Sequence, residues 1–201
     1  MSAAEALARR DPDLARAIAA VGPVNLRPAL DTSFAALCRS IVFQQLAGRA
    51  AAAIYGRFVQ AVGPELTAAA VLATPEPALR AAGLSAAKTA SLRDLSAKVV
   101  EGMVALEGIH ELTDDEIVAQ LSSVRGIGRW TAHMFLIFQL RRPDVWPVDD
   151  LGVRRGYAVM HRVAVWPTPK ELERLGEVYR PWRSVAAWYC WRMTDVVLPA
   201  P

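Results

Sequence analysis

The sequence is poor in cysteine and contains no long hydrophobic run. Its two cysteines, Cys38 and Cys190, both lie in apolar helical stretches and make neither a disulfide framework nor a set of four metal ligands. A strongly apolar window such as residues 134–138 is far too short to span a bilayer, and the first residues lack an export signal's charged-then-apolar pattern. We therefore expect a cytoplasmic protein with no membrane partner.

The sequence also contains few lysines and no pattern typical of β-strands. Only three of the 23 basic residues are lysine, a bias that suits bidentate phosphate contacts but is equally typical of a GC-rich genome. The net charge of +3 and the pI near 9.1 are compatible with nucleic acid but do not locate a binding surface. No segment alternates apolar and polar residues between turn signals, so we predict an all-α fold of about ten helices.

Capping residues, prolines and glycines divide the chain into short helices. The expected helices cover residues 11–21, 33–44, 49–62, 75–83, 85–104, 113–123, 130–140 and 168–178, and a last helix has Pro181 in its first turn. The loop at 108–113 is the expected crossover between two helical lobes. The first lobe would cover approximately 30–108 and the second approximately 109–201, with residues 1–29 returning to pack on the second.

The central stretch, residues 121–156, contains a glycine hairpin that opens a helix. The segment Val-Arg-Gly-Ile-Gly, residues 124–128, lies between an amphipathic run and an apolar run. Two glycines leave backbone N–H groups open at the N-terminus of the second helix, where unpaired donors and the helix dipole favour a phosphate oxygen. The alternative is a plain glycine turn between two core helices.

Two adjacent carboxylates, Asp149 and Asp150, follow Trp146-Pro147-Val148 and precede an apolar helical run. Either could be an N-cap. The functional alternative is a carboxylate held ionised in a cleft near the hairpin, because a helix of three turns would bring the chain back towards that end.

Five motifs stand out along the chain: Leu-x-x-Val-x-Gly-Ile-Gly-Arg-Trp-Thr-Ala at 121–132, Trp-Pro-Val-Asp-Asp-Leu-Gly at 146–152, Arg-Ser-Ile-Val-Phe-Gln-Gln-Leu at 39–46, Gly83-Leu84-Ser85 with Lys88, and Arg-Pro-Trp-Arg-Ser at 180–184. In combination and order, these motifs resemble the helix-hairpin-helix DNA glycosylases, and most closely the 3-methyladenine DNA glycosylase II (AlkA-like) group. The resemblance implies a two-lobed helical bundle with the helix-hairpin-helix at 113–140 and an active-site cleft between the lobes.

The resemblance also implies roles for single residues. Asp150 matches the catalytic carboxylate, and Trp130 and Trp191 match positions that line the base pocket, with Met134 on the same helix side as Trp130. Gln45 or Leu46 would fill the gap left by an extruded base. Around the hairpin, Gly126, Gly128, Arg125 and Arg129 would contact DNA phosphate, and the carbonyls of Ser122, Val124 and Ile127 would hold a structural monovalent cation.

Two absences define the implied reaction. Relatives that also cleave the strand carry a nucleophilic lysine where this chain has Trp130, and indole cannot form a Schiff base. Relatives with an iron–sulfur cluster need four closely spaced C-terminal cysteines. The resemblance further implies a short form without the β-rich N-terminal domain of longer members. We therefore expect a monomeric, monofunctional hydrolase that excises alkylated bases from double-stranded DNA in base excision repair, needs no cofactor, contains no iron–sulfur cluster and, in a bacterium, associates with the nucleoid. The alternative is a non-catalytic module that binds damaged DNA.

Overall fold

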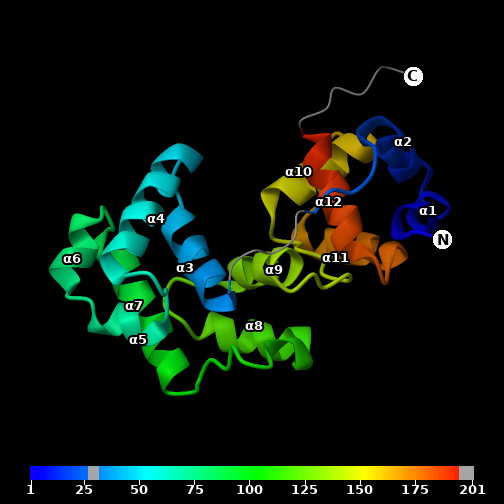
Figure 1. The fold of residues 1–201 in the computed structure, drawn as a ribbon. Helices are drawn as coiled ribbons and strands as arrows, with labels where there is room; N and C mark the ends of the chain where they lie inside the picture. Colours follow the sequence, from blue (N-terminus) through cyan, green and yellow to red (C-terminus); the bar gives the residue numbers. More distant parts are fainter. Residues whose placement is uncertain (27–31, 195–201) are drawn as a thin grey trace. The chain divides into compact units, whose positions relative to one another are not determined.

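A computed structural model describes residues 1–26 and 32–194 (Figure 1). Within these ranges the chain forms twelve α-helices, two short 3₁₀ helices and no strand, so the predicted all-α fold is confirmed. No helix there is long and apolar enough to cross a membrane. The elements are α1 Ala3–Ala8, α2 Pro12–Val21, α3 Ser33–Phe43, α4 Gly48–Val62, α5 Ala68–Ala73, α6 Glu76–Ala81, α7 Ala86–Val100, η1 Ile109–Glu111, α8 Asp114–Ser122, α9 Arg129–Phe138, α10 Leu151–His161, α11 Pro169–Leu175, η2 Gly176–Tyr179 and α12 Arg183–Met193.

Many of these helices begin at a polar side chain that satisfies their first N–H groups. Asp11 accepts hydrogen bonds from two N–H groups at the start of α2. Thr113 and Glu116 form a reciprocal capping box at the start of α8, and residue 113 is where the sequence predicts that this helix begins. Because the capping residues are visible in the sequence, the starts of these helices can be predicted without knowledge of the fold.

Several elements differ from the prediction, which did not include helix α1. Helix α5 lies in an alanine-rich stretch where no helix was predicted. Helix α7 ends at Val100, earlier than predicted, and Gly102 just beyond it has a φ of +75°, which a continuing helix does not allow. Pro181 follows a cis peptide bond and precedes the last helix, which begins at Arg183.

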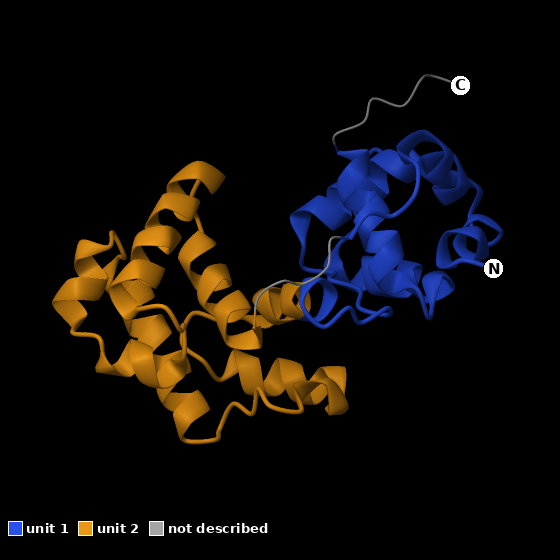
Figure 2. Ribbon diagram, viewed as in Figure 1, with its two compact units in different colours: residues 1–27, 136–201 blue, residues 28–135 orange. Residues whose placement is uncertain are grey.

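The chain forms two compact units (Figure 2). We call residues 1–27 with 136–201 the terminal unit, and residues 28–135 the central unit. This division differs from the predicted lobes, because the hairpin segment belongs with the helices that precede it. The reason lies on α7, where Asp94 accepts the Arg125 N–H at 2.7 Å and Lys98 donates to the Ser123 carbonyl.

In the terminal unit, α10 and α12 pack with almost no space between their backbones. A Cβ atom at Gly156 on α10 would lie 1.8 Å from the carbonyl oxygen of Cys190 on α12, so this contact requires glycine. Helix α2 packs against both of these helices, and α1 packs against α2 and α12. The first two helices and the last helix of the described chain are thus joined in one core.

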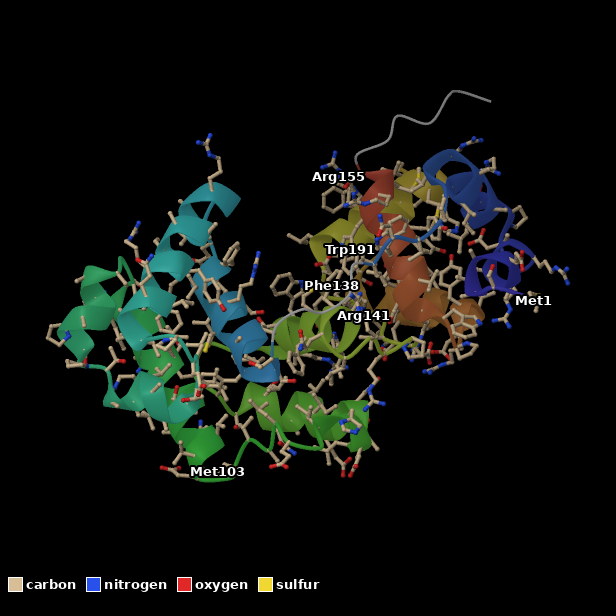
Figure 3. All side chains as sticks on the ribbon, in the orientation of Figure 1. Met1, Met103, Phe138, Arg141, Arg155 and Trp191 are labelled. Atoms are coloured by element: carbon tan, nitrogen blue, oxygen red, sulfur yellow. The ribbon has the colours of Figure 1, made fainter. Side chains whose placement is uncertain are left out.

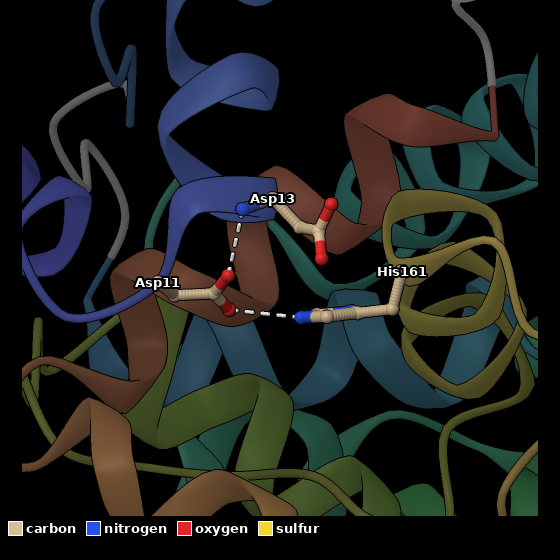
Figure 4. A group of neighbouring side chains, drawn as sticks. All are labelled: Asp11, Asp13 and His161. Atoms are coloured by element: carbon tan, nitrogen blue, oxygen red, sulfur yellow. Dashed lines mark hydrogen bonds and ion pairs between the residues drawn. The ribbon is translucent and has the colours of Figure 1, made fainter.

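A buried network ties the N-terminal helices to the rest of the terminal unit (Figure 4). The carboxylate of Asp11 accepts hydrogen bonds from His161 at 2.8 Å, from the Tyr179 hydroxyl at 2.6 Å and from the Asp13 N–H at 2.9 Å. Burial raises the pKa of Asp11, but the hydrogen bonds from Tyr179 and His161 outweigh it, and the net shift of the pKa is downward. Asp11 is therefore both a helix cap and a tether.

The central unit is built around α7. Helices α3, α5 and α6 all pack against it, and α4 packs against α3 and α6. The side chains of Leu37 and Ile41 on α3, Phe58 on α4 and Leu92 on α7 are fully buried. Their burial positions the end of α3 and residues 91–98 of α7 beside the hairpin.

Candidate active site

The predicted hairpin is a tight turn between α8 and α9. The Ile127 N–H donates to the Val124 carbonyl at 3.0 Å, and both side chains are buried. Gly126 has a φ of +78°, in the left-handed region that favours glycine. Within the described part of the chain, the N–H groups of Gly126 and Gly128 donate to no protein acceptor. These exposed donors beside a helix N-terminus are suited to a phosphate oxygen.

One face of α7 contacts the hairpin through Ser91, Asp94 and Lys98, which are neighbours along the helix surface. A Cβ atom at Gly126 would lie 2.6 Å from Ser91 Oγ. Asp94 accepts the Arg125 N–H at 2.7 Å and pairs with Lys98 at 3.0 Å. Burial raises the pKa of Asp94, but these two donors together outweigh it, and the net shift is downward. The hairpin is therefore fixed by an ionised side chain as well as by its own turn.

The hairpin also contains the other residues predicted to contact phosphate or a cation. The Arg125 and Arg129 side chains are exposed beside the glycines. Of the three carbonyls assigned to a cation, those of Ser122, Val124 and Ile127, the Val124 oxygen accepts one hydrogen bond from the Ile127 N–H. Its second lone pair remains for a ligand, and carbonyl oxygens are ligands that hard cations prefer.

A pocket of about 550 Å³ lies at the end of α3 and the start of α9. Its lining residues are Ser40, Phe43, Gln44, Gln45, Gly126, Trp130, Thr131 and Met134. The structure therefore brings together four predicted site residues from two distant parts of the sequence: Gln45, Gly126, Trp130 and Met134. Leu46 does not line this pocket, and its side chain is 39% exposed.

Sequence reasoning missed four lining residues: Ser40, Phe43, Gln44 and Thr131. Three of them lie inside the signature at 39–46, but the signature alone does not show which side chains face a cavity. Gln44 and Gln45 are adjacent and chemically identical, so residue type does not distinguish them, but their backbone conformations differ. Gln45 has a φ of +56°, whereas Gln44 has a φ of −53°.

In the terminal unit, Asp150 caps α10 and is nearly buried. Its Oδ1 atom accepts the Val153 N–H at 2.7 Å and the Trp191 indole N–H at 2.8 Å. The Trp191 ring stacks on Phe138, with ring centres 5.5 Å apart and an angle of 29° between the planes (Figure 3). Asp149 is exposed. Of the two adjacent carboxylates, only Asp150 is thus held by a cap and an indole.

The indole N–H of Trp191 was not predicted to have a partner. The resemblance implies that its π face forms a wall of the base pocket. The structure instead shows Phe138 against one of its faces and Asp150 at its N–H. A side-chain contact between residues on two different helices has no signal in the sequence.

The described residues thus define a helical protein of the helix-hairpin-helix class. The open N–H groups at its turn are suited to DNA phosphate, and an aspartate caps the next helix. A model of the HhH-GPD superfamily of base excision DNA repair proteins matches residues 38–181. The chain belongs to this family, which confirms the resemblance drawn from its motifs.

Known relatives are similar over most of the chain. DNA-3-methyladenine glycosylase 1 of Schizosaccharomyces pombe is 36% identical over 163 residues, which cover 80% of this chain and 72% of the relative. The solved structure of a 3-methyladenine DNA glycosylase from the same yeast, in complex with abasic DNA, matches with a TM-score of 0.85 at 32% identity over 98% of both chains. A DNA-3-methyladenine glycosidase from Bacillus halodurans matches with a TM-score of 0.87 at 32% identity, over 96% of this chain and 88% of the other.

Proposed function

We propose that this protein is a base excision repair glycosylase that hydrolyses the N-glycosidic bond of alkylated bases, of the 3-methyladenine type, in double-stranded DNA. The observation that carries the proposal is the nearly buried Asp150 carboxylate, fixed through one oxygen by two N–H donors, in a chain that belongs to a base excision repair family. A base stacked inside a duplex hides this bond, so the damaged nucleotide must first leave the helix.

Asp150 is the proposed catalytic carboxylate. Positive charge develops on the sugar as the bond to the base lengthens, and an ionised carboxylate stabilises that charge or orients the attacking water. An N-alkylated purine is already cationic and leaves as a neutral base, so the reaction requires no general acid. The donors from Val153 and Trp191 restrict rotation of the carboxylate. Trp191 therefore acts as a positioning residue for Asp150.

The proposed base site in the central unit is the pocket beside α9. Trp130 is 45% exposed and shares the pocket with Phe43 and Met134. Aromatic faces attract a cationic ring by cation–π contact, worth about 0.5–2 kcal/mol. An alkylated purine is therefore favoured over an undamaged, neutral one.

Open N–H groups at Gly126 and Gly128, with the side chains of Arg125 and Arg129, are proposed to hold the DNA backbone. Such contacts fix the register of the protein on the duplex without reading its sequence. The exposed pair Gln45 and Leu46 is proposed to fill the gap that the extruded base leaves.

We also propose that the reaction ends at an abasic site. Strand cleavage by the lysine route needs a free amine at the base site, where this chain has Trp130. The lysines of α7 are engaged: Lys88 donates to two carbonyls of the α3 end, and Lys98 donates to Asp94 and to a hairpin carbonyl. Neither amine is available as a nucleophile in this arrangement.

No redox or cluster chemistry is part of the proposal. Cys38 and Cys190 are both fully buried, one in each unit, and burial raises the pKa of both thiols. A buried protonated thiol is a poor iron ligand. We propose that the only ion is a structural monovalent cation on the hairpin carbonyls, which would add positive charge beside the phosphate. Exchange of K⁺ for tetramethylammonium at constant ionic strength should then weaken binding to undamaged duplex.

Release of the base from methylated duplex DNA tests the function. We expect wild type and Asp149→Asn to release 3-methyladenine at rates within about twofold of each other, and Asp150→Asn to be slower on the order of 100-fold or more. Asp149→Asn is a matched control, because it removes the neighbouring exposed carboxylate. Tight lesion binding by wild type with no release would instead identify a damage-sensing module.

A further inference from the structure

Gln44 connects two functional segments of the central unit that lie far apart in the sequence. Its side-chain amide donates to the Gly126 carbonyl at 2.8 Å. Gln44 is the C-cap of α3 and directly precedes Gln45 and Leu46, while Gly126 is the turn residue of the hairpin. One hydrogen bond thus joins two segments with proposed roles in DNA binding. The Gln45–Leu46 loop would fill the gap in the duplex, and the hairpin would bind the DNA backbone.

The same loop is anchored to α7 by Lys88. Its ammonium donates to the carbonyls of Val42 at 2.6 Å and Gln44 at 2.8 Å. A cation at the C-terminal end of α3 interacts favourably with that helix's dipole, and burial lowers the pKa of Lys88. Ser91, one turn further along α7, contacts Gly126 of the hairpin. Helix α7 therefore holds both the loop, through Lys88, and the hairpin, through Ser91. The Gln44 side chain joins the loop directly to the hairpin.

We propose that Gln44 is a positioning residue that couples the DNA-binding hairpin to base extrusion. This inference rests on the proposed function. When the hairpin binds a phosphate, the Gln44 side chain keeps the Gln45–Leu46 loop at a fixed distance from the bound phosphate. The loop can then enter the duplex as the base leaves. Without the bond, the left-handed backbone at Gln45, with a φ of +56°, is free to relax away.

The geometry predicts a selective defect. Gln44→Met keeps the length of the side chain and removes its donor. Loss of one neutral hydrogen bond should slow single-turnover release of a base-paired lesion roughly 3- to 10-fold. Affinity for undamaged duplex should stay within about twofold of wild type, because the Gly126 and Gly128 N–H groups are unchanged.

The chain provides a matched control in Gln120→Met. Gln120 is also half-buried in the central unit, and its side chain also bonds to backbone, accepting the Ala105 N–H at 3.1 Å. We expect Gln120→Met to release base at the wild-type rate. The decisive substrate is the same lesion placed opposite a one-nucleotide gap, where extrusion costs little. There Gln44→Met should equal wild type within about twofold.

Each outcome bears on the inference separately from the function. If Gln44→Met slows both substrates equally, or neither, Gln44 does not act through extrusion and the inference is overturned. If wild type releases no base at all, the proposed function fails instead. A fluorescent base analogue next to the lesion then reports extrusion directly, and the inference requires Gln44→Met to reduce its signal relative to Gln120→Met.

Discussion

Replacing Trp191 with phenylalanine tests how Asp150 is held. Phenylalanine retains a ring to stack on Phe138 but loses the indole N–H, which donates to Asp150 Oδ1 at 2.8 Å. A hydrogen bond to a charged acceptor contributes about 1.5–3 kcal/mol. Because the Val153 N–H still holds the same oxygen at 2.7 Å, we expect the lower end of that range, about 1.5 kcal/mol or roughly a tenfold loss.

The loss should appear in the rate of the chemical step. Single-turnover base release measured at several enzyme concentrations separates that rate from the half-saturating concentration. A positioning role lowers the maximal rate and leaves the concentration dependence within about twofold, whereas loss of a base-stacking wall would raise the concentration needed for half saturation. A Trp191→Phe enzyme with the wild-type maximal rate would refute the argument that the indole N–H orients the carboxylate.

Three further predictions concern stability and DNA binding. Gly156→Ala should destabilise by more than about 4 kcal/mol, because its Cβ would lie 1.8 Å from a carbonyl oxygen of α12. Gly56→Ala is the control, because a Cβ atom there would have nothing within 4 Å; it should stabilise the protein by about 0.5–1 kcal/mol in thermal unfolding. Equal changes in stability for Gly156→Ala and Gly56→Ala would contradict the packing argument. Gly126→Ala should weaken undamaged-duplex binding at least about fivefold in fluorescence anisotropy, because it strains a left-handed φ and contacts Ser91; unchanged affinity would argue against phosphate binding at the hairpin. Because the pKa of Asp11 is lowered in the folded protein, its contribution to the free energy of unfolding is present above its usual pKa of 3.8 and is lost as the pH falls through the folded value. Urea unfolding from about pH 6 down to about pH 3 should therefore show a steeper acid loss for wild type than for Asp11→Asn, and parallel curves would exclude this role.

Local signals determined which helices could be predicted. Capping boxes begin helices α8 and α11, at Thr113 and Thr168. They are visible in the sequence because their hydrogen bonds join residues three positions apart. Helix α5, residues Ala68–Ala73, was not predicted because a short alanine-rich run has little apolar periodicity. This helix is stabilised by packing against α7. The unit boundary was missed for a similar reason. Asp94 and the Arg125 N–H are 31 residues apart, and no spacing rule connects them.

The candidate site divides in the same way. Trp130, Gly126 and Asp150 stand within motifs whose order and spacing could be compared with a known family. Gln44 could not be separated from Gln45 by that route, because its partner carbonyl is 82 residues away. Side-chain hydrogen bonds to distant backbone depend on packing that a pattern does not encode.

The position of Asp150 shows that its two interpretations from the sequence, helix cap and catalytic carboxylate, are compatible. A cap is a carboxylate whose orientation is set by the backbone of the helix it begins, here through the Val153 N–H. Catalysis by charge stabilisation needs the same property, a carboxylate fixed before the reaction begins. Asp149, exposed and outside the helix, has neither the orientation nor the burial that would strengthen its field. If Asp150 is catalytic, Asp150→Asn should therefore separate the two roles: an amide oxygen can still accept the Val153 N–H and preserve the fold, while the charge that the reaction needs is gone.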